Sequence, residues 1–205
     1  SVFEGTPYDM TADKDWLVPD GAGGMKRSPL TTPFPTRDMR ELLDIDWHRM
    51  IPRGGYGMIA QLRGWLPDCV GGVYWFYVDN SHVGPYVPIY AGVTDISPLY
   101  NTYNPRKFSE DSARWVYDFI DNLLYLKWQD AIKDVRAVRD PIEAGFFADQ
   151  AAVDAKAVEL ASKDPELAKD YLTELTTKRM EQLVQAYRDL RYSLIVEYTN
   201  NRQGL

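Results

Sequence analysis

The pattern of apolar and polar residues predicts three strands in the middle of the chain. Residues 56–62 mix β-forming side chains with small ones, residues 73–78 form an unbroken aromatic and β-branched run, and residues 86–90 form a shorter run that contains Pro88. Turn-forming residues separate the runs, so a meander is the simplest pairing. Because proline cannot donate to a ladder, Pro88 indicates an edge or a bulge, whereas the continuous run predicts a strand covered on both faces.

Helical periodicity dominates the chain after Ser109, which is expected to cap the first helix. Start signals at Asp140-Pro141 and Asp164-Pro165 predict a second and a third helix, and a break inside the third would give a fourth. The short connections favour antiparallel packing. The three expected apolar stripes are Trp115, Phe119, Ile120, Leu123, Leu124, Trp128, Ile132 and Val135; Ile142, Phe146, Val153, Ala157 and Leu160; and Leu183, Tyr187, Leu190, Leu194 and Tyr198.

The N-terminal part shows no sustained periodicity and is rich in Gly, Pro, Thr and Asp. We expect residues 1–53 to form a looped segment with one short helix, capped by Thr36 and running to about Leu43. Residues 54–95 are then a strand meander and residues 109–205 a helical array, all within one region. The predicted fold class is α+β: a small antiparallel sheet with three or four long C-terminal helices and more helix than strand.

Composition narrows the functional classes. The 205 residues are 45% hydrophobic, 26% charged and 13% aromatic, which indicates a soluble globular protein that folds. The net charge of −7 and the absence of a Lys/Arg cluster argue against nucleic-acid or anionic-membrane partners. No apolar run is long enough for a membrane span, and no signal peptide begins at Ser1. A single cysteine excludes an internal disulfide and leaves the compartment open, cytoplasmic or exported.

Several stretches resemble one family. Residues 61–67 (Gln-Leu-Arg-Gly-Trp-Leu-Pro), 71–75 and 86–94 are similar to the C-terminal half of the dipeptidase A type cysteine peptidases, which are bacterial N-terminal-nucleophile hydrolases. Residues 4–9 and 108–115 fit the same family, so the resemblance spans nearly the whole chain. The resemblance implies that the parent protein is a hydrolase that acts in proteolysis. It also implies that this chain is an incomplete part of the N-terminal-nucleophile hydrolase fold.

The resemblance also implies what this chain lacks. The family nucleophile is a cysteine at the mature N-terminus, whose own α-amino group acts as base, with an acyl-enzyme and no metal or organic cofactor. Here Cys69 lies in a turn between strands, next to Asp68, which makes a reactive thiolate unfavourable. Ser1 has no strand or base-and-oxyanion pattern beside it. We therefore expect this chain to be inactive alone, with the N-terminal half of the same enzyme as its partner.

Arg63 and Gln61 are the first candidate substrate contacts. They lie two residues apart on a predicted strand and so share one face. The resemblance implies that Arg63 binds a carboxylate of a small peptide substrate or the developing oxyanion. The alternative is a surface or interdomain salt bridge.

Glu4, Thr6 and Asp9 form a second candidate group. Paired carboxylates suit the free amine of a dipeptide, but turn and cap chemistry explains the same residues. His48 and His82 stand alone, without a second ligand at helical or hairpin spacing, so no metal site is predicted.

Two functions of different class follow. In the first, this chain is the C-terminal domain of a dipeptidase whose cysteine lies elsewhere. In the second, it is a non-catalytic helical interaction or oligomerisation module. Under the resemblance, strands of the missing half close the sheet, so this chain alone should expose an apolar surface and form a homo-oligomer.

Overall fold

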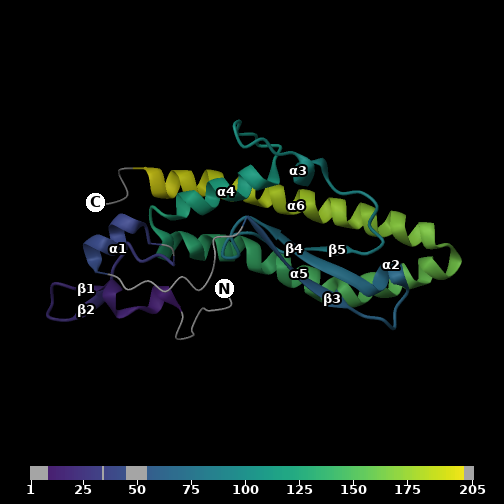
Figure 1. The fold of residues 1–205 in the computed structure, drawn as a ribbon, viewed down its shortest axis with the longest axis horizontal. Helices are drawn as coiled ribbons and strands as arrows, with labels where there is room; N and C mark the ends of the chain where they lie inside the picture. The colour runs from purple at the N-terminus through teal and green to yellow at the C-terminus, as the bar shows by residue number, and fades with distance from the viewer. Residues whose placement is uncertain (1–8, 34, 45–54, 201–205) are drawn as a thin grey trace.

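The computed structural model describes residues 9–33, 35–44 and 55–200 of the chain. Helices predominate and the strands form two small antiparallel sheets, which confirms the predicted α+β class (Figure 1). In chain order the elements are η1 (Met10–Ala12), η2 (Lys14–Trp16), β1 (Leu17–Pro19), β2 (Met25–Arg27), α1 (Arg37–Leu43), β3 (Tyr56–Leu62), α2 (Asp68–Gly71), β4 (Gly72–Val78), β5 (Val87–Tyr90), α3 (Pro98–Asn101), α4 (Ala113–Leu124), α5 (Trp128–Lys163) and α6 (Pro165–Thr199).

The N-terminal segment contains more regular structure than its composition predicts. Strands β1 and β2 pair as an antiparallel hairpin, from Leu17 opposite Arg27 to Pro19 opposite Met25. The Asp20 carboxylate closes the turn by accepting from the backbone N–H of Gly24 at 2.9 Å. The predicted cap of α1 is confirmed, because the Thr36 hydroxyl accepts from the backbone N–H of Met39 at 3.2 Å.

The three central strands form the predicted meander, in the order β3-β4-β5 and antiparallel throughout. Pro88 lies on the edge strand β5, as its missing N–H requires. The prediction that the run at 73–78 is covered on both faces is wrong for the described residues. Val73 and Trp75 are buried against the helices, whereas Tyr74, between them, is 37% exposed on the other face. Aromatic side chains favour a strand whether or not the second face is covered, so the run alone could not decide this.

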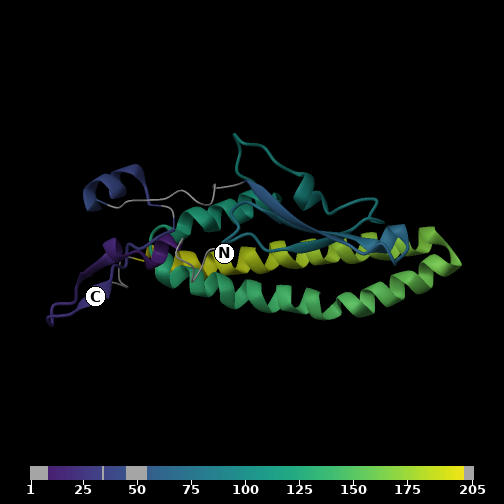
Figure 2. The same cartoon turned by 60° about the horizontal axis from the view of Figure 1, so that its bottom comes forward.

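The boundaries of the first two long helices differ from the predicted ones. The first predicted helix is divided, because α4 begins after Ser112 rather than Ser109 and ends at Leu124, and α5 starts at Trp128. Helix α5 then continues for 36 residues through Pro141, which was expected to begin a new helix. Proline inside a helix removes one hydrogen bond and bends the axis, and α5 is visibly bowed in Figure 2.

The start of α6 is as predicted. The Asp164 carboxylate accepts from the backbone N–H of Glu166 at 2.9 Å, and Pro165 occupies the first turn. The helix runs unbroken to Thr199, so the expected break within it does not occur. Helices α5 and α6 form a long antiparallel pair that covers one side of the β3–β5 sheet (Figures 1 and 2).

Two buried clusters hold these layers together. Residues of the first join the sheet to the middle of α5 and α6: Val70, Val73, Trp75, Val87, Tyr90, Phe146, Val153, Ala157, Leu172, Met180 and Leu183. Residues of the second join α4 to the start of α5 and the end of α6: Val83, Ala113, Val116, Tyr117, Ile120, Leu124, Trp128, Ala131, Ile132, Val135, Val184, Tyr187, Leu190 and Leu194. The buried face of α4 centres on Val116 and Ile120 instead of Trp115 and Phe119, so its predicted stripe is rotated.

None of the described helices combines the length and apolar character that crossing a membrane requires.

Candidate functional site

Arg63, the residue after β3, is buried, with 8% of its surface exposed. Its guanidinium pairs with the carboxylate of Asp154 on α5 and donates to the backbone carbonyl of Val70 at 2.7 Å. A longer bond of 3.4 Å reaches the carbonyl of Gly71. All of these partners belong to α5 or to the connection between β3 and β4, so Arg63 fixes that connection against the helix. Arg63 therefore forms a buried salt bridge within this chain, which differs from the surface or interdomain pair named as the alternative, and substrate binding by Arg63 stays a prediction.

Gln61 lies on the same face as Arg63, as the strand alternation predicts. Its side-chain carbonyl accepts from the Gln150 amide at 2.6 Å and from the Trp75 indole at 3.3 Å. Gln150 and Asp154 are one helical turn apart on α5, which matches the two-residue spacing of Gln61 and Arg63 on the strand. The two predicted site residues are therefore brought together, and both are engaged with α5.

Tyr90 on β5 completes this buried polar group. The Arg63 guanidinium lies 5.9 Å from the centre of the Tyr90 ring. Burial, and after it the Asp154 carboxylate, raise the pKa of the Tyr90 hydroxyl well above its usual range. The hydroxyl therefore stays protonated at physiological pH and cannot serve as a base there.

A hollow of about 210 Å³ opens at the end of the sheet beside Arg63. It is lined by Leu62, Leu66, Ala91 and three glycines, with Arg63 and Asp68 as its charged residues. One of the glycines, Gly71, is required by space, because a Cβ there would lie 2.8 Å from the Arg63 carbonyl oxygen. Ligand pockets usually measure roughly 300–1,000 Å³, so this hollow is small for a complete substrate site.

The second predicted group is not brought to Arg63. Glu4 and Thr6 lie outside the described residues. Asp9 caps η1 by accepting from the backbone N–H and the hydroxyl of Thr11, at 3.0 and 2.6 Å, which is the turn chemistry named as its alternative. The segment that begins at Asp9 leads to the β1–β2 hairpin, toward the end of the molecule opposite α2 (Figure 1).

Cys69 and the histidines show no catalytic arrangement in the described part of the chain. Cys69 is half-buried in α2, where its backbone packs against Gly92, and no hydrogen bond to its thiol occurs among the described residues. His82 is buried and lies edge-on to Trp128, with ring centres 6.1 Å apart. His48 falls outside the described residues. No group of three potential metal ligands occurs among those that are described.

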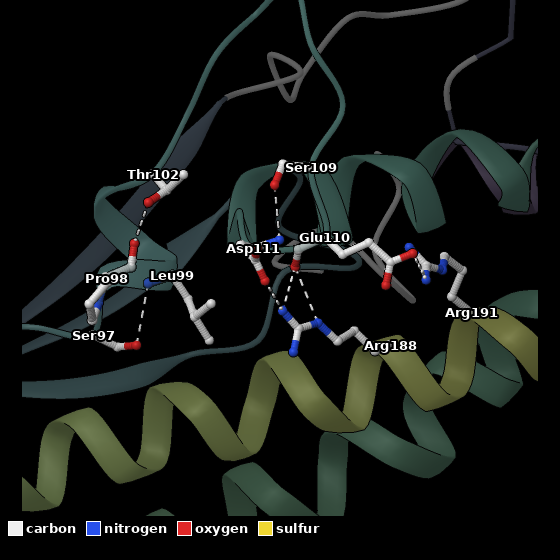
Figure 3. Close-up of polar contacts among 9 residues, drawn as sticks. All are labelled: Ser97, Pro98, Leu99, Thr102, Ser109, Glu110, Asp111, Arg188 and Arg191. Atoms are coloured by element: carbon white, nitrogen blue, oxygen red, sulfur yellow. Dashed lines mark hydrogen bonds and ion pairs between the residues drawn. The ribbon is translucent and has the colours of Figure 1, made fainter.

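The segment at 108–115, which contributes to the family resemblance, binds α6 (Figure 3). Arg188 donates to the backbone carbonyl of Glu110 at 2.6 Å and lies 3.3 Å from the Asp111 carboxylate. Arg191, almost fully buried, pairs with the Glu110 carboxylate at 2.7 Å. The charged residues of this segment thus hold the entry to α4 against α6 and have a structural role.

An acidic cluster at the end of β4 was not singled out from the sequence. Asp79 is buried, has a left-handed backbone (φ 75°), and accepts from Arg114 on α4 at 2.5 Å. Arg114 also contacts Asp118, one turn later, at 3.2 Å, and Asp121 accepts from Asn80 at 3.3 Å. Burial, and then the nearby Asp121, raise the pKa of Asp79 to about 6, against the opposing effect of Arg114. The Asp79-Asn80 pair directly after the aromatic strand is the sequence feature that could have indicated this cluster. The same pair equally predicts a turn.

Comparison with known proteins adds a family to this geometry. A sequence profile of peptidase family C69 matches residues 31–140, which is more than half of the chain. A protein described as probable dipeptidase B, from Streptococcus pyogenes serotype M1, is 24% identical over 149 residues. These residues are 72% of this chain and 29% of that relative, so the match covers less than a third of the relative's length.

Proposed function

Because the chain belongs to peptidase family C69, we propose that it is the C-terminal part of a cysteine-type dipeptidase whose nucleophile lies outside these 205 residues. The nucleophile is a cysteine at the mature N-terminus with its own α-amino group as base. The family match carries this proposal, and the description of the longer relative as a probable dipeptidase supports it.

The chemistry proposed for the parent enzyme is two-step acyl transfer. The N-terminal thiolate attacks the peptide carbonyl, the amine of the second residue leaves with a proton, and water hydrolyses the thioester to free the first residue. Cys69, the chain's only cysteine, has neighbours on both sides in sequence and sits in α2. It therefore lacks the free α-amino group that this mechanism uses.

In this proposal, the 205-residue chain supplies the enzyme with a β-sheet that helices cover on one face. Helices α5 and α6 cover the face that carries Val73 and Trp75, whereas Tyr74 and Met58 are exposed on the other. An apolar sheet face of this kind usually packs against another layer. We propose that the rest of the enzyme covers it. Because α5 and α6 pack against the sheet, we favour the proposal of a dipeptidase part over the alternative of a free-standing helical interaction module.

Within this proposal Arg63 and Gln61 position the end of β3 by holding it to α5. Their side chains are already bound to Asp154 and Gln150. Direct contact with the dipeptide through Arg63, Gln61, Glu4, Thr6 or Asp9 stays a prediction. The Arg63→Lys substitution described in the Discussion tests it for Arg63.

The test is turnover of a simple dipeptide by the 205-residue chain and by its Ser1→Ala and Cys69→Ala variants. The proposal expects no hydrolysis above background in any of them, because loss of a covalent nucleophile typically costs several orders of magnitude. The longer parent should hydrolyse the same dipeptide and lose that activity when its N-terminal cysteine becomes alanine. Turnover by this chain that Cys69→Ala or Ser1→Ala abolishes would place the nucleophile here and contradict the proposal.

A further inference from the structure

Two deeply buried carboxylates lie where the end of β4 meets α4. Asp79, the residue after β4, is 4% exposed, and Asp121 on α4 is 5% exposed. Asn80 links the two elements, because its side-chain amide donates to the Asp121 carboxylate at 3.3 Å. Carboxylates are rarely buried this deeply unless they are paired or protonated. The way in which the charge of Asp79 is compensated therefore decides the state of this junction.

The Asp79 carboxylate is compensated at one oxygen only. Its Oδ1 accepts from the Arg114 guanidinium at 2.5 Å, whereas its Oδ2 is buried without a hydrogen-bond partner among the described residues. A buried acceptor without a donor costs free energy, and it costs more when it carries charge. A proton on Oδ2 removes this cost, because the carboxyl group becomes neutral and its O–H becomes a donor.

Among the described residues, the charged groups that act on Asp79 come from α4. Burial, and after it the Asp121 carboxylate, raise the pKa of Asp79 to about 6. Arg114 opposes this rise in pKa, and Asp118 adds to it. On the strand side the contact is uncharged, since the Asp79 N–H donates to the Gly55 carbonyl at 2.8 Å. The surroundings of Asp79 therefore favour a proton at Oδ2 over a second negative charge beside Asp121.

Asp79 also starts the connection between β4 and β5, which comprises residues 79–86. Its backbone is left-handed (φ 75°), a conformation that a non-glycine residue keeps where other contacts hold it. The Asn80 carbonyl then accepts from the N–H groups of Val83 and Gly84, at 3.0 and 2.7 Å. Val83 is fully buried among the helices. The contacts of Asp79 and Asn80 with α4 thus hold the first turn of this connection in place.

We propose that the junction of Asp79 and Asn80 with α4 is a proton switch. With a proton on Oδ2, Asp79 donates to the Asp121 carboxylate, and residues 79–84 stay bound to α4. When this proton passes to water, two carboxylates remain beside each other in a buried place, and like charges at close range are destabilising. Residues 79–84 then open locally, so that water solvates Asp79 while the rest of the chain stays folded.

Two further titratable residues belong to this connection or contact it. His82 is buried, and its backbone carbonyl accepts from Arg139 of α5 at 2.6 Å. Glu143, also on α5, accepts from the Tyr86 N–H at 2.6 Å, and burial raises the pKa of its carboxyl group. Because histidine also titrates near neutral pH, a test of the switch has to observe Asp79 itself and to change residues of α4.

Carbon-13 NMR of the side-chain carboxyl groups measures this proton directly in the 205-residue chain. The Asp79 resonance should titrate at about pH 6 in wild type. In Asp121→Asn its midpoint should fall by at least about one pH unit, because the neighbouring charge is removed. Asp118→Asn is the matched control, since it removes a more exposed carboxylate of α4 and should shift the midpoint by less. A wild-type midpoint near the ordinary value of about 4, or an equal shift in both variants, would overturn the proposal.

Amide hydrogen exchange measures the opening. After correction for the intrinsic pH dependence, the Val83 and Gly84 amides of wild type should exchange at least about tenfold faster at about pH 7.5 than at about pH 5. Asp121→Asn should largely remove this acceleration, because Asp79 then stays in one charge state over the interval.

Urea at low concentration separates local opening from unfolding of the whole chain. Exchange at Val83 and Gly84 at about pH 7.5 should hardly depend on urea, because a local opening exposes little surface. If their exchange follows urea as steeply as that of the most protected amides of the central strand β4, the connection opens only with the whole chain and the switch is wrong. None of these results depends on dipeptidase activity, so they leave the proposed function to its own test.

Discussion

Arg63 and Asp154, 91 residues apart in the sequence, form a buried ion pair that joins the end of β3 to the C-terminal half of α5. The same guanidinium binds the carbonyls of Val70 and Gly71, so one side chain connects the strand, the β3–β4 connection and the helix. The geometry uses the planar fork of arginine, which a lysine cannot reproduce.

We therefore expect Arg63→Lys to lower the free energy of unfolding by about 1–3 kcal/mol, because two charge-assisted bonds are lost while the charge stays buried. Urea unfolding of the chain measures this loss. In the longer parent enzyme, kcat/KM of the folded fraction should stay near normal. An unchanged stability with a large loss of kcat/KM would instead assign Arg63 to substrate binding.

Arg37→Lys is the matched control for this substitution. Arg37 forms an exposed pair with Glu41 on α1, at 2.7 Å, and exposed pairs of this kind contribute about 0–1 kcal/mol. A loss as large as that of Arg63→Lys would show that the effect is not specific to the buried pair.

Substitution of Tyr187 should reveal how much one buried hydrogen bond contributes to the free energy of unfolding. Its hydroxyl donates to the Val83 carbonyl at 2.5 Å and so holds the β4–β5 connection against α6. Tyr187→Phe should destabilise the chain by roughly 1–2 kcal/mol, because the carbonyl stays buried without its donor. Tyr192→Phe, on the exposed side of the same helix, should change stability by less than about 0.5 kcal/mol in the same thermal or urea measurement.

Two glycines should respond in opposite directions to alanine. Gly145 is exposed inside α5 with nothing within 4 Å of an added Cβ, so Gly145→Ala should stabilise the chain by about 0.5–1 kcal/mol. At Gly84 the added Cβ would lie 2.2 Å from the Val78 carbonyl oxygen, so Gly84→Ala should be strongly destabilising. Melting temperatures of the two variants give the signs, and a stabilised Gly84→Ala would contradict the close packing of the β4–β5 connection.

The sequence predicted those elements that local chemistry determines. The aromatic run of β4, the proline of β5, the Thr36 cap and the Asp164-Pro165 start each act within a few residues, and the structure has them in place. The end of α4 escaped prediction because residues 125–127, Tyr-Leu-Lys, contain neither glycine nor proline. Pro141 was misleading for the opposite reason, since tertiary packing keeps α5 helical through it.

The candidate site was predictable in part. Strand alternation placed Gln61 and Arg63 on one face, which the bonds to α5 confirm. Their partners Gln150 and Asp154 lie about ninety residues away, and no spacing in a single sequence indicates such a pairing. The left-handed backbone and the burial of Asp79 likewise arise from how β4 meets α4.

Asp79 should make the stability of the chain depend on pH. One oxygen of its carboxylate binds Arg114, and the other is buried without a hydrogen-bond partner among the described residues. Burial raises its pKa from 3.8 to about 6, so the folded chain holds this proton more tightly than the unfolded chain does. The resulting stability is fully present below the unfolded pKa and is lost as pH rises through the folded one.

Between about pH 4 and pH 7 this group should therefore lower the free energy of unfolding by on the order of 2–3 kcal/mol as pH rises. Asp79→Asn removes the titration and keeps a residue type that tolerates the left-handed backbone, so its stability should vary less over the same interval. Urea unfolding of both proteins across this pH range gives the difference in slope. Asp118→Asn, which removes the more exposed carboxylate beside the same arginine, should retain most of the wild-type slope. If Asp79→Asn keeps the full slope while Asp118→Asn loses it, the assignment to Asp79 is wrong.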